Sequence, residues 1–254
     1  MLLCIDIGNT NLVFGVWHGG TWQARYRVRT VQDKMEDEYA MLLNNLLKDS
    51  GLSLSKVDRA VISSVVPELR PVFRKLFKKY CDISPLVLGP GVKTGLTINI
   101  DNPSELGADL VADAVAARER CTGACIVVDF GTATTFSGIS EKGEYMGVAI
   151  APGIEVAAKA LSLRAAQLPR ISLVPPPSAL GKNTISSMQA GLIFGYIGLV
   201  ENLIATIKEE LGGRATVIAT GGSSSVIAPH ASSIDIIDPH LTLEGLRIIN
   251  DKNT

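Results

Sequence analysis

One short pattern occurs twice in this chain of 254 residues. The first copy, residues 4–11, reads Cys-Ile-Asp-Ile-Gly-Asn-Thr-Asn, and the second, residues 127–134, reads Val-Val-Asp-Phe-Gly-Thr-Ala-Thr. Each is an apolar run that ends in Asp-x-Gly and a polar turn. The carboxylate can hold a hydrated cation, and glycine lets backbone N–H groups approach an anion, so the pattern suits metal–phosphate chemistry. The repetition predicts two similar halves that close over one nucleotide.

Composition narrows the class of protein. A formal net charge of −1 and an aromatic content of 5% argue against nucleic acid or an anionic membrane as the main partner. The uncharged stretch 183–200 contains Asn, Thr, Ser and Gln, so we expect a buried helix there and not a membrane span. No export signal follows Met1, and four scattered cysteines are typical of free thiols. The expected compartment is the cytoplasm.

Hydrophobic periodicity and turn residues predict alternating strands and helices. Expected strands are 2–6, 13–17, 21–28, 57–66, 85–88, 124–129, 135–139, 145–150, 215–219 and 234–238. Expected helices are 36–48, 71–80, one capped by Ser104 that runs to Arg120, one from Gly153, 184–211 and 243–249. Antiparallel strands followed by strand–helix crossovers, stated once and repeated, predict an α/β protein with a duplicated actin-like (ribonuclease-H-like) fold. Its two mixed-sheet subdomains would be residues 1–119 and 120–254, with the nucleotide cleft between them.

The two aspartates are the first candidate site residues. Asp6 and Asp129 interrupt apolar strands, where an unpaired carboxylate is costly to bury. A hairpin turn or a strand end explains the glycines and hydroxyl residues but not these acids. We therefore expect both aspartates to be functional.

Seven segments in order resemble the type III pantothenate kinase family of the acetate and sugar kinase, heat-shock chaperone and actin superfamily. The similarity covers nearly the whole chain. The segments are 6–11 (Asp-Ile-Gly-Asn-Thr-Asn), 63–67 (Ser-Ser-Val-Val-Pro), 89–95 (Gly-Pro-Gly-Val-Lys-Thr-Gly), 107–109 (Gly-Ala-Asp), 128–134 (Val-Asp-Phe-Gly-Thr-Ala-Thr), 187–191 (Ser-Met-Gln-Ala-Gly) and 220–222 (Thr-Gly-Gly). A single glycine motif is weak evidence, whereas seven in order are specific.

The resemblance implies an ATP-dependent kinase that converts pantothenate to 4′-phosphopantothenate, the first step of coenzyme A synthesis. It implies a homodimer, Mg²⁺ held by Asp6 through water, and a monovalent cation, K⁺ or NH₄⁺, held by Asp129. The implied ATP-binding residues are Asp6, Ile7, Gly8, Asn9, Thr10, Asn11, Leu12, Val13, Gly131, Thr132, Gly221 and Gly222.

The resemblance also assigns the acceptor side. Asp109 matches the family's catalytic aspartate, which takes the proton from the hydroxyl that is phosphorylated. From spacing alone, Glu105, Asp109 and Asp113 would form a solvated acidic stripe on one helix face. The implied substrate-binding residues are Gly107, Ala108, Asp109, Leu110 and Thr184. Thr184 opens a helix, so it is equally well explained as an N-cap.

The chain departs from the family pattern at three positions. Leu110 stands where many members have arginine, Asp113 where asparagine is common, and Ile100 where tyrosine is common. Arginine offers a forked cation for a carboxylate, which leucine lacks. Three interpretations stay open: another cation such as Lys159, Arg164 or Lys182 replaces it, the acceptor is less anionic than pantothenate, or the chain is a weakly active or inactive paralogue. The competing functions are a kinase of another small hydroxy-acid or polyol and a non-catalytic nucleotide-binding regulator.

Overall fold

The computed structural model describes the whole chain, Met1–Thr254, and its residue contacts divide it into two compact units. Unit 1 comprises Met1–Leu96, Asn102–Ala116 and Leu241–Thr254, and unit 2 comprises Thr97–Asp101 and Ala117–His240. The division falls inside helix α3 (Ala108–Arg120), close to the expected boundary between residues 119 and 120. The C-terminal segment 241–254, which we expected in the second subdomain, is part of unit 1 because its apolar face packs on the first sheet.

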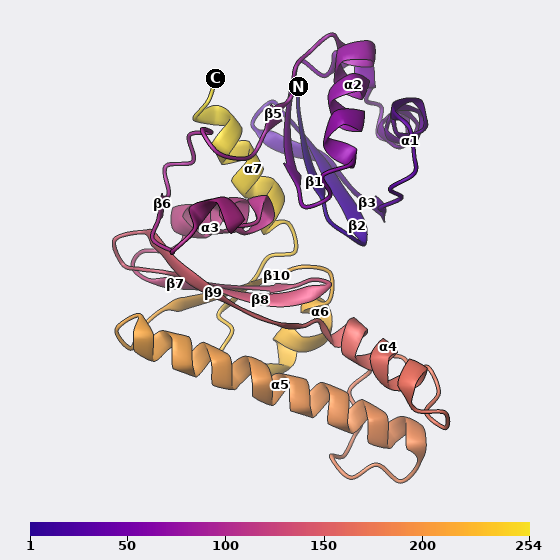
Figure 1. The fold of residues 1–254 in the computed structure, drawn as a ribbon, viewed down its shortest axis with the longest axis vertical. Coiled ribbons are helices and arrows are strands. Elements are labelled where there is room, and N and C mark those ends of the chain that lie inside the picture. Colours follow the sequence, from indigo (N-terminus) through magenta and orange to yellow (C-terminus); the bar gives the residue numbers. More distant parts are fainter. The chain divides into compact units, whose positions relative to one another are not determined.

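Unit 1 is built on a five-stranded sheet in the order β3-β2-β1-β4-β5 (Figure 1). Its strands are β1 (Leu2–Ile7), β2 (Asn11–His18), β3 (Thr21–Arg29), β4 (Arg59–Ser64) and β5 (Leu86–Val87). Its helices are α1 (Glu36–Asp49), α2 (Leu69–Cys81), α7 (Leu241–Asp251) and the first part of α3, with short 3₁₀ helices at Leu54–Lys56 and Pro103–Glu105. β1 pairs antiparallel with β2 and parallel with β4.

Unit 2 contains a six-stranded sheet in the order β11-β10-β7-β8-β9-β6. Its strands are β6 (Thr97–Ile98), β7 (Cys125–Phe130), β8 (Ala133–Ile139), β9 (Glu144–Pro152), β10 (Thr216–Thr220) and β11 (Ile236–Ile237). Its helices are α4 (Ile154–Arg164), α5 (Thr184–Glu210) and α6 (Ser224–Ile227), followed by a 3₁₀ turn at Ala228–His230. α5 runs along one face of this sheet (Figure 1).

The two sheets share one topology. Read from its β9 side, the second sheet runs β9-β8-β7-β10-β11, which repeats β3-β2-β1-β4-β5 strand for strand. In both, three antiparallel strands are followed by two parallel strands reached through crossovers. The repeat confirms the predicted duplicated actin-like fold and makes β1 and β7, the strands that carry Asp6 and Asp129, equivalent.

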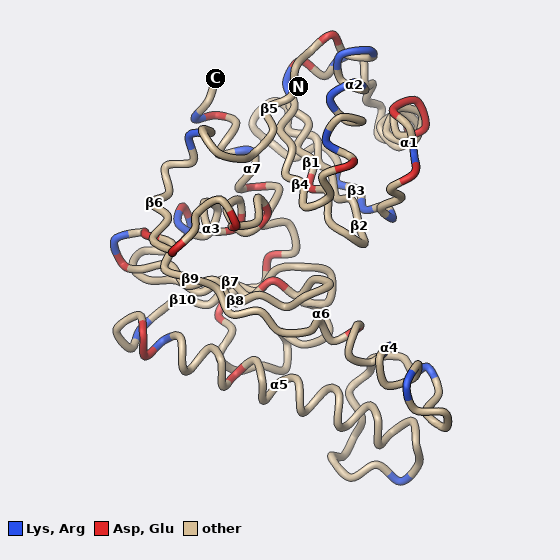
Figure 2. The backbone as a smooth tube through the Cα atoms, viewed as in Figure 1, with Lys and Arg blue, Asp and Glu red and all other residues tan.

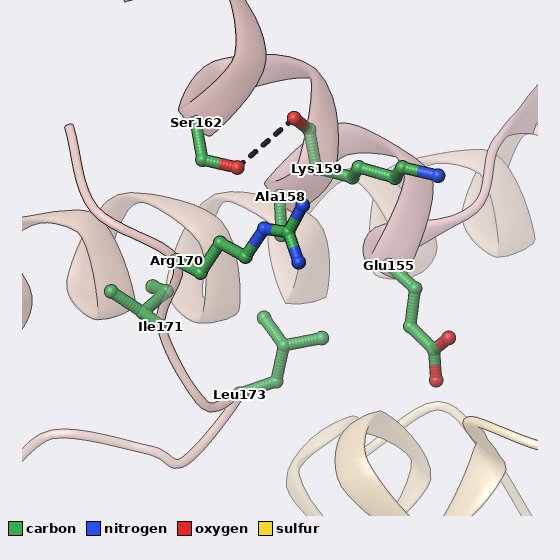
Figure 3. A pocket seen from close by; sticks show the side chains of 7 residues that line it. All are labelled: Glu155, Ala158, Lys159, Ser162, Arg170, Ile171 and Leu173. Carbon is green, nitrogen blue, oxygen red and sulfur yellow. Dashed lines mark hydrogen bonds between the residues drawn. The ribbon is translucent and has the colours of Figure 1, made fainter. Parts of the chain in front are cut away.

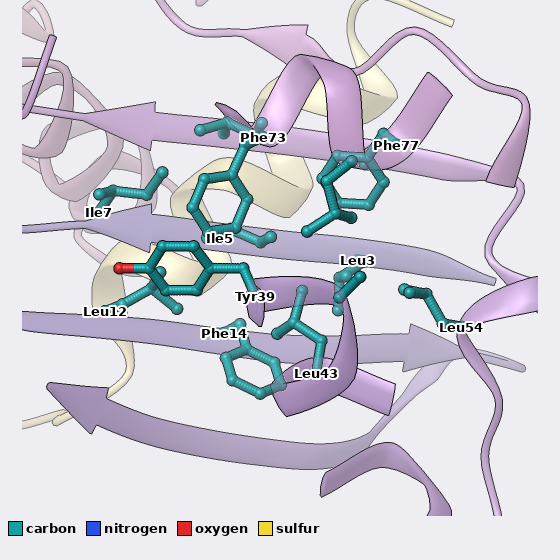
Figure 4. Close-up of a cluster of buried hydrophobic side chains, with 14 of the residues drawn as sticks. Leu3, Ile5, Ile7, Leu12, Phe14, Tyr39, Leu43, Leu54, Phe73 and Phe77 are labelled. Carbon is teal, nitrogen blue, oxygen red and sulfur yellow. The ribbon is translucent and has the colours of Figure 1, made fainter. Parts of the chain in front are cut away.

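Alternation along β1 assigns its side chains to the two faces of the first sheet. Leu3, Ile5 and Ile7 belong to the buried cluster that α1 and α2 cover, together with Tyr39 and Phe73 (Figure 4). The Tyr39 and Phe73 ring centroids lie 4.9 Å apart, and the Tyr39 hydroxyl donates to the Val31 carbonyl at 2.8 Å, so this buried ring keeps a polar partner.

The opposite face of β1 carries Leu2, Cys4 and Asp6, and α7 packs on it. The charges of Arg247 and Glu244 on α7 influence the pKa of the Cys4 thiol, so the two elements are in close contact. α7 also packs on α3: a Cβ atom on Gly245 would overlap the Ala112 carbonyl oxygen. Asp6 therefore faces the α7 side of the sheet, the side on which α3 also lies.

Three local expectations are corrected. Ser104 does not cap α3, because Asn102 caps a separate 3₁₀ helix there and α3 begins only at Ala108. Thr184 is not an N-cap, because the Asn183 side chain accepts the Ser186 backbone N–H at 2.9 Å and caps α5. The short elements β6 and α6 are absent from the expected set.

The helix expected to be buried, α5, is only partly so. Its length and composition are those of a helix that could cross a membrane, with a mean hydropathy of 1.7 over its most apolar 18 residues. Only 28% of those residues are buried within the chain. Residues 184–200 carry no charge (Figure 2), and Ile185 and Phe194 are exposed. One face of this apolar helix is therefore left uncovered by the rest of the chain.

Candidate active site

The first Asp-x-Gly turn follows β1 and is held by its own backbone. The Gly8 N–H donates to the Asn11 carbonyl at 3.0 Å, and the Thr30 hydroxyl donates to the Gly8 carbonyl at 2.7 Å. Asn9 and Thr10 are exposed at the tip. The turn thus presents polar groups outward on a fixed backbone, as a phosphate-binding loop requires.

Ile7, Leu12 and Val13 frame this turn. Ile7 and Leu12 are fully buried in the cluster under α1 and α2. Val13 is the register partner of Asp6 on β2. The side chains of Ile7 and Leu12 therefore hold the turn on the core, and only their backbone groups are placed to meet a ligand.

A buried hydroxyl accompanies Asp6. Asp6 pairs in register with Ser63 on the parallel strand β4, so their side chains share one face of the sheet. The Ser63 hydroxyl is fully buried and makes no hydrogen bond in the structure. Because buried polar groups are nearly always paired, this hydroxyl marks a position where a ligand or water would complete the set.

Asp109 lies in the first turn of α3, and its carboxylate folds back over the preceding glycine. Asp109 Oδ1 accepts the Leu110 backbone N–H at 2.9 Å, and a Cβ atom on Gly107 would overlap that oxygen. Desolvation by burial raises the pKa of this carboxyl above its ordinary value, although the Leu110 N–H opposes the shift. A raised pKa makes Asp109 a stronger base than an exposed aspartate.

The acidic stripe expected from spacing does not form. Glu105 is exposed on the separate 3₁₀ helix, Asp109 is half-buried, and Asp113 is 1% exposed. Leu110 is also buried, at 8% exposed. Burial of Asp113 and Leu110 makes α3 a core helix, with half-buried Ala108 and Asp109 at its N-terminal end.

The second Asp-x-Gly turn follows β7 in unit 2 and meets two further loops. The Gly131 N–H donates to the Ala133 carbonyl at 3.1 Å, which corresponds to the Gly8–Asn11 bond but closes a turn one residue shorter. The Gly153 N–H, at the start of α4, donates to the Thr132 carbonyl at 3.1 Å. Thr132 is exposed. The turn is therefore fixed against the N-terminus of α4, where helix N–H groups favour anions.

The glycine loop after β10 completes this group. Gly221 has φ +88°, and a Cβ atom there would overlap Asp129 Oδ1 and the Phe130 backbone. The Ser223 N–H donates to the Phe130 carbonyl at 3.1 Å, and the Ser223 hydroxyl donates to Glu155 at 3.2 Å. Gly222 is exposed beside them. Unit 2 thus brings Asp129, Gly131, Thr132 and Gly221 together.

Thr184 is not part of this group by any contact in the structure. It is the exposed first residue of α5, directly after the Asn183 cap. Nothing in its surroundings tests the acceptor role that the resemblance implies.

The donor sets fit the cations that the fold family implies. No group of three or more His, Cys, Asp or Glu side chains gathers anywhere in the chain, so no closed protein cage for a metal exists. Mg²⁺ in nucleotide sites needs only one or two carboxylates besides water and substrate phosphates, and Asp6 with the Ser63 hydroxyl beside it meets that need. At Asp129, a carboxylate oxygen is the kind of ligand that suits a hard monovalent cation.

Solved structures of the same fold are known. A conserved Baf family protein from Campylobacter jejuni aligns with 99% of this chain and 98% of its own at a TM-score of 0.62 and 21% identity. The activator of 2-hydroxyisocaproyl-CoA dehydratase from Clostridium difficile, solved with bound ADPNP, aligns with 99% of this chain and 95% of its own at a TM-score of 0.54 and 11% identity. At these identities the likeness shows the fold alone, which is the duplicated actin-like α/β fold.

Sequence comparison gives the family. The family model for type III pantothenate kinase matches residues 2–206. The protein named type III pantothenate kinase of Moorella thermoacetica is 51% identical over 254 residues, which is 100% of both chains. The chain therefore belongs to the type III pantothenate kinase family.

Sequence reasoning misses several residues that shape these turns. Thr30 ties down the first turn from the end of β3, and Glu155 links α4 to Ser223. The sequence indicates Gly153 only as a helix start, yet a Cβ atom there would overlap the Gly131 and Thr132 carbonyl oxygens. A glycine directly after a strand and before a helix is a signal of close backbone approach, whereas nothing in the sequence distinguishes Thr30.

Proposed function

We propose that this chain transfers the γ-phosphoryl group of ATP to the primary hydroxyl of pantothenate, giving 4′-phosphopantothenate, the first step of coenzyme A synthesis. The observation that carries the proposal is the full-length identity of 51% to a relative named for this activity. The repeated Asp-x-Gly turns on the equivalent strands β1 and β7 support it.

The ATP-binding residues come from both turns and from the Gly221–Gly222 loop. In each turn the backbone is held by its own hydrogen bonds, so its N–H groups are oriented before the phosphates arrive. Asp6 would hold Mg²⁺ through water, and Asp129 would hold K⁺ or NH₄⁺. These cations would neutralise charge on the phosphates, which together with positioning accounts for most of the catalysis in phosphoryl transfer.

Asp109 is the proposed general base. The pantothenate hydroxyl oxygen attacks the γ-phosphorus in line, the bond to the β–γ bridging oxygen breaks, and ADP leaves with that electron pair. The hydroxyl proton passes to the Asp109 carboxylate. Its raised pKa, caused by burial, suits it to accept this proton.

The two alternatives are less well supported. A kinase of another small hydroxy-acid or polyol would use the same ATP-binding residues, but the family model and the full-length relative both carry the name pantothenate kinase. A non-catalytic regulator has no need of a half-buried carboxylate folded over Gly107 at the start of α3.

The proposed assembly is a homodimer that covers the open face of α5. Gly191, Gly195 and Gly198 lie on that helix, and a Cβ atom added to any of them would meet no other atom within 4 Å. Large apolar side chains are also exposed on α4, on the following segment and on α5: Val156, Leu161, Leu163, Val174, Leu180, Ile185 and Phe194. An apolar surface of this kind is typical of a protein–protein interface, and glycines let a partner helix approach closely.

The proposed compartment is the cytoplasm. All four cysteines are free, and Cys4 and Cys125 are buried thiols. Free thiols are typical of a reducing compartment.

The test is a direct assay of the purified protein with ATP, Mg²⁺ and K⁺. We expect ADP release that depends on pantothenate. An equal amount of a product heavier than pantothenate by one phosphoryl group should be detected by mass spectrometry. A panel of hydroxy-acids and polyols serves as the control. ADP release with one of these acceptors and none with pantothenate would favour the first alternative. Tight ATP binding without turnover on any acceptor would favour the second.

A further inference from the structure

Three arginines alternate along β3, the edge strand of the first sheet. Arg25, Arg27 and Arg29 are exposed, and the residues between them are half-buried. They project from the same face of β3, since successive side chains of a strand point to opposite faces. None of them takes part in an ion pair in the structure. The strand thus presents unpaired positive charge, which we call the β3 arginine row.

The register of the sheet places this row on the face that carries Asp6. Val13 of β2 pairs with Asp6 of β1 on one side and with Arg27 of β3 on the other. Residues directly opposite each other in a ladder share a face, so Asp6, Val13 and Arg27 form one line across three strands. Each antiparallel step is about 5 Å between Cα atoms, which puts the Cα atom of Arg27 about 10 Å from that of Asp6. A long arginine side chain spans much of that distance.

A ring contact on β3 agrees with this assignment of faces. The Arg25 guanidinium lies over the Trp22 ring, 5.1 Å from its centroid, and Trp22 Nε1 donates to Glu244 of α7 at 3.0 Å. α7 packs on the face of β1 that carries Asp6, so the β3 arginine row lies on the α7 side of the sheet. An aromatic ring holds Arg25 there, whereas no ring contact holds the other two arginines.

Arg29 lies beside the first Asp-x-Gly turn. It pairs in register with Asn11, the residue at which β2 begins after the turn. The next residue, Thr30, donates its N–H to the Thr10 carbonyl at 3.0 Å and its hydroxyl to the Gly8 carbonyl at 2.7 Å. This end of β3 is therefore bonded to the turn itself, and the nearest arginines flank the groups that would meet a phosphate.

The first turn has no cationic side chain of its own. Residues 6–13 contain the Asp6 carboxylate and neither lysine nor arginine. The polyphosphate of ATP is strongly anionic, so a carboxylate repels it unless positive charge stands close by. Guanidinium groups bind phosphate oxygens through paired N–H bonds. The β3 arginine row supplies positive charge next to a turn that lacks it.

Two cations in unit 2 also make no ion pair. Lys159 and Arg170 line a pocket of about 400 Å³ between α4 and the segment that follows it (Figure 3). Glu155 stands in the same lining and contributes a negative charge. No residue of that lining belongs to an Asp-x-Gly turn, whereas Arg29 pairs in register with one. The β3 arginine row is thus the cationic surface that the backbone joins to a phosphate-binding turn.

We infer that Arg27 and Arg29 bind the polyphosphate of the nucleotide beside the first turn. The use of ATP rests on the proposed function. The backbone of the turn orients the phosphates, and the two guanidinium groups add the charge that holds them. Arg25 takes no part, because it is farther from the turn and its guanidinium lies over Trp22.

The experiment measures nucleotide binding separately from turnover. ADPNP is titrated into the full-length protein by calorimetry in the presence of Mg²⁺ and K⁺. The variants are Arg27→Gln and Arg29→Gln, and Arg25→Gln is the matched control, because it removes the same charge from the same face of the strand. Loss of a charge-assisted bond should weaken ADPNP binding about 10-fold in each variant, with the control within about 2-fold of the unchanged protein. Arg27→Lys, which keeps the charge, should restore part of the affinity.

A second ligand identifies the group that is recognised. Inorganic tripolyphosphate, which has no nucleoside, should compete with ADPNP, and its affinity should fall by a similar factor in Arg27→Gln and Arg29→Gln. Loss of ADPNP affinity without loss of tripolyphosphate affinity would overturn the inference and assign both arginines to the nucleoside. Unchanged ADPNP binding in both variants would also overturn it.

The control tests a different role for these charges. Charged side chains protect an edge strand from pairing with another chain, and that role makes all three arginines equivalent. An equal effect of Arg25→Gln, Arg27→Gln and Arg29→Gln on ADPNP binding would therefore exclude a specific phosphate contact.

Failure of the proposed function gives a different result. If ADPNP binding depends on Arg27 and Arg29 but the unchanged protein never phosphorylates pantothenate, the phosphate contacts stand and the kinase assignment falls. If pantothenate is phosphorylated and neither substitution changes ADPNP binding, the kinase assignment stands and the phosphate contacts fall.

Discussion

The carboxylate of Asp129 lies directly against the backbone of Gly221, so that a Cβ atom on residue 221 would overlap Asp129 Oδ1. Asp129 is the last residue but one of β7, and Gly221 directly follows β10; these two strands are parallel neighbours in the second sheet. The carboxyl ends of adjacent parallel strands meet at one edge of a sheet, which is where α/β proteins place their ligands. The first two predictions concern this contact and the cation it would hold.

Gly221→Ala should weaken ATP binding. Alanine at this position must adopt a left-handed backbone conformation, which costs about 1–2 kcal/mol. Its Cβ atom also displaces the Asp129 side chain. We expect the KM for ATP to rise about 10-fold or more, measured by steady-state kinetics. Gly213→Ala is the control, because Gly213 has φ +91° with nothing near its Cβ position. Equal effects of the two substitutions would show that the overlap with Asp129 is unimportant.

Potassium should be required for turnover. Asp129 offers a carboxylate, an oxygen ligand suited to a monovalent cation such as K⁺. We expect replacement of K⁺ by Na⁺ at constant ionic strength to suppress kcat, and Asp129→Asn to abolish the difference between the two salts. Indifference of the unchanged protein to the swap would remove the monovalent cation from the mechanism.

Asp109→Asn should reduce turnover without a comparable effect on ATP binding. The amide cannot accept the hydroxyl proton, so we expect kcat to fall about 10²-fold or more while the Kd for ATP stays within a few-fold. Because burial raises the pKa of Asp109, activity should also decline on acidification at a higher pH than an exposed aspartate would give. A pH–rate profile measures this decline on the acidic side. Unchanged turnover in the Asn variant would exclude Asp109 as the base.

The same substitution should stabilise the fold at neutral pH. A carboxyl whose pKa is raised in the folded state holds its proton more tightly there than in the unfolded chain. Its stabilising contribution is present below the unfolded pKa and is lost as the pH rises through the folded pKa. At pH 7 the ionised Asp109 side chain therefore destabilises the fold, and asparagine removes that effect. The Tm of the variant should be higher than that of the unchanged protein at pH 7, and the difference should become smaller as the pH is lowered. Exposed Asp101→Asn is the control, and a lower Tm for Asp109→Asn would contradict the argument.

Phe194→Asp should dissociate the proposed homodimer. Phe194 is 40% exposed within the uncharged part of α5, so an aspartate there would place a charge in the interface. Sedimentation velocity should report a dimer for the unchanged protein and a monomer for the variant. Thr206→Asp adds the same charge at an exposed position further along α5 and should remain dimeric. A monomer for the unchanged protein would refute the assembly.

Much of this fold could be predicted because its signals are local. β1 and β7 are apolar runs ended by Asp-x-Gly, and α1 and α2 show clear helical periodicity, so their bounds differ from expectation by at most two residues. The two-residue strand β6 and the four-residue helix α6 are too short to carry a period. The place of α7 depends on packing against β1, which no local pattern reveals.

The residues of the candidate site also differ in how well the sequence predicts them. Asp6 and Asp129 could be proposed because charges in apolar runs are conspicuous in a sequence, whereas Asp109 is proposed only from the family resemblance. Spacing places Asp113 on a solvated stripe, yet it is buried in α3, on which α7 packs, and spacing along one helix does not reveal such packing. Thr30 could not be found, since its bond to the Gly8 carbonyl depends on how the end of β3 packs against the first turn.

The central strand of each sheet carries one fully enclosed thiol, Cys4 in β1 and Cys125 in β7. Burial raises the pKa of both, that of Cys125 to about 12, so at neutral pH neither is ionised or within reach of an alkylating reagent. Each half of the molecule thus contains its own chemical reporter of opening. The order in which the two sulfurs become labelled as urea is added would reveal which half of this duplicated chain unfolds first.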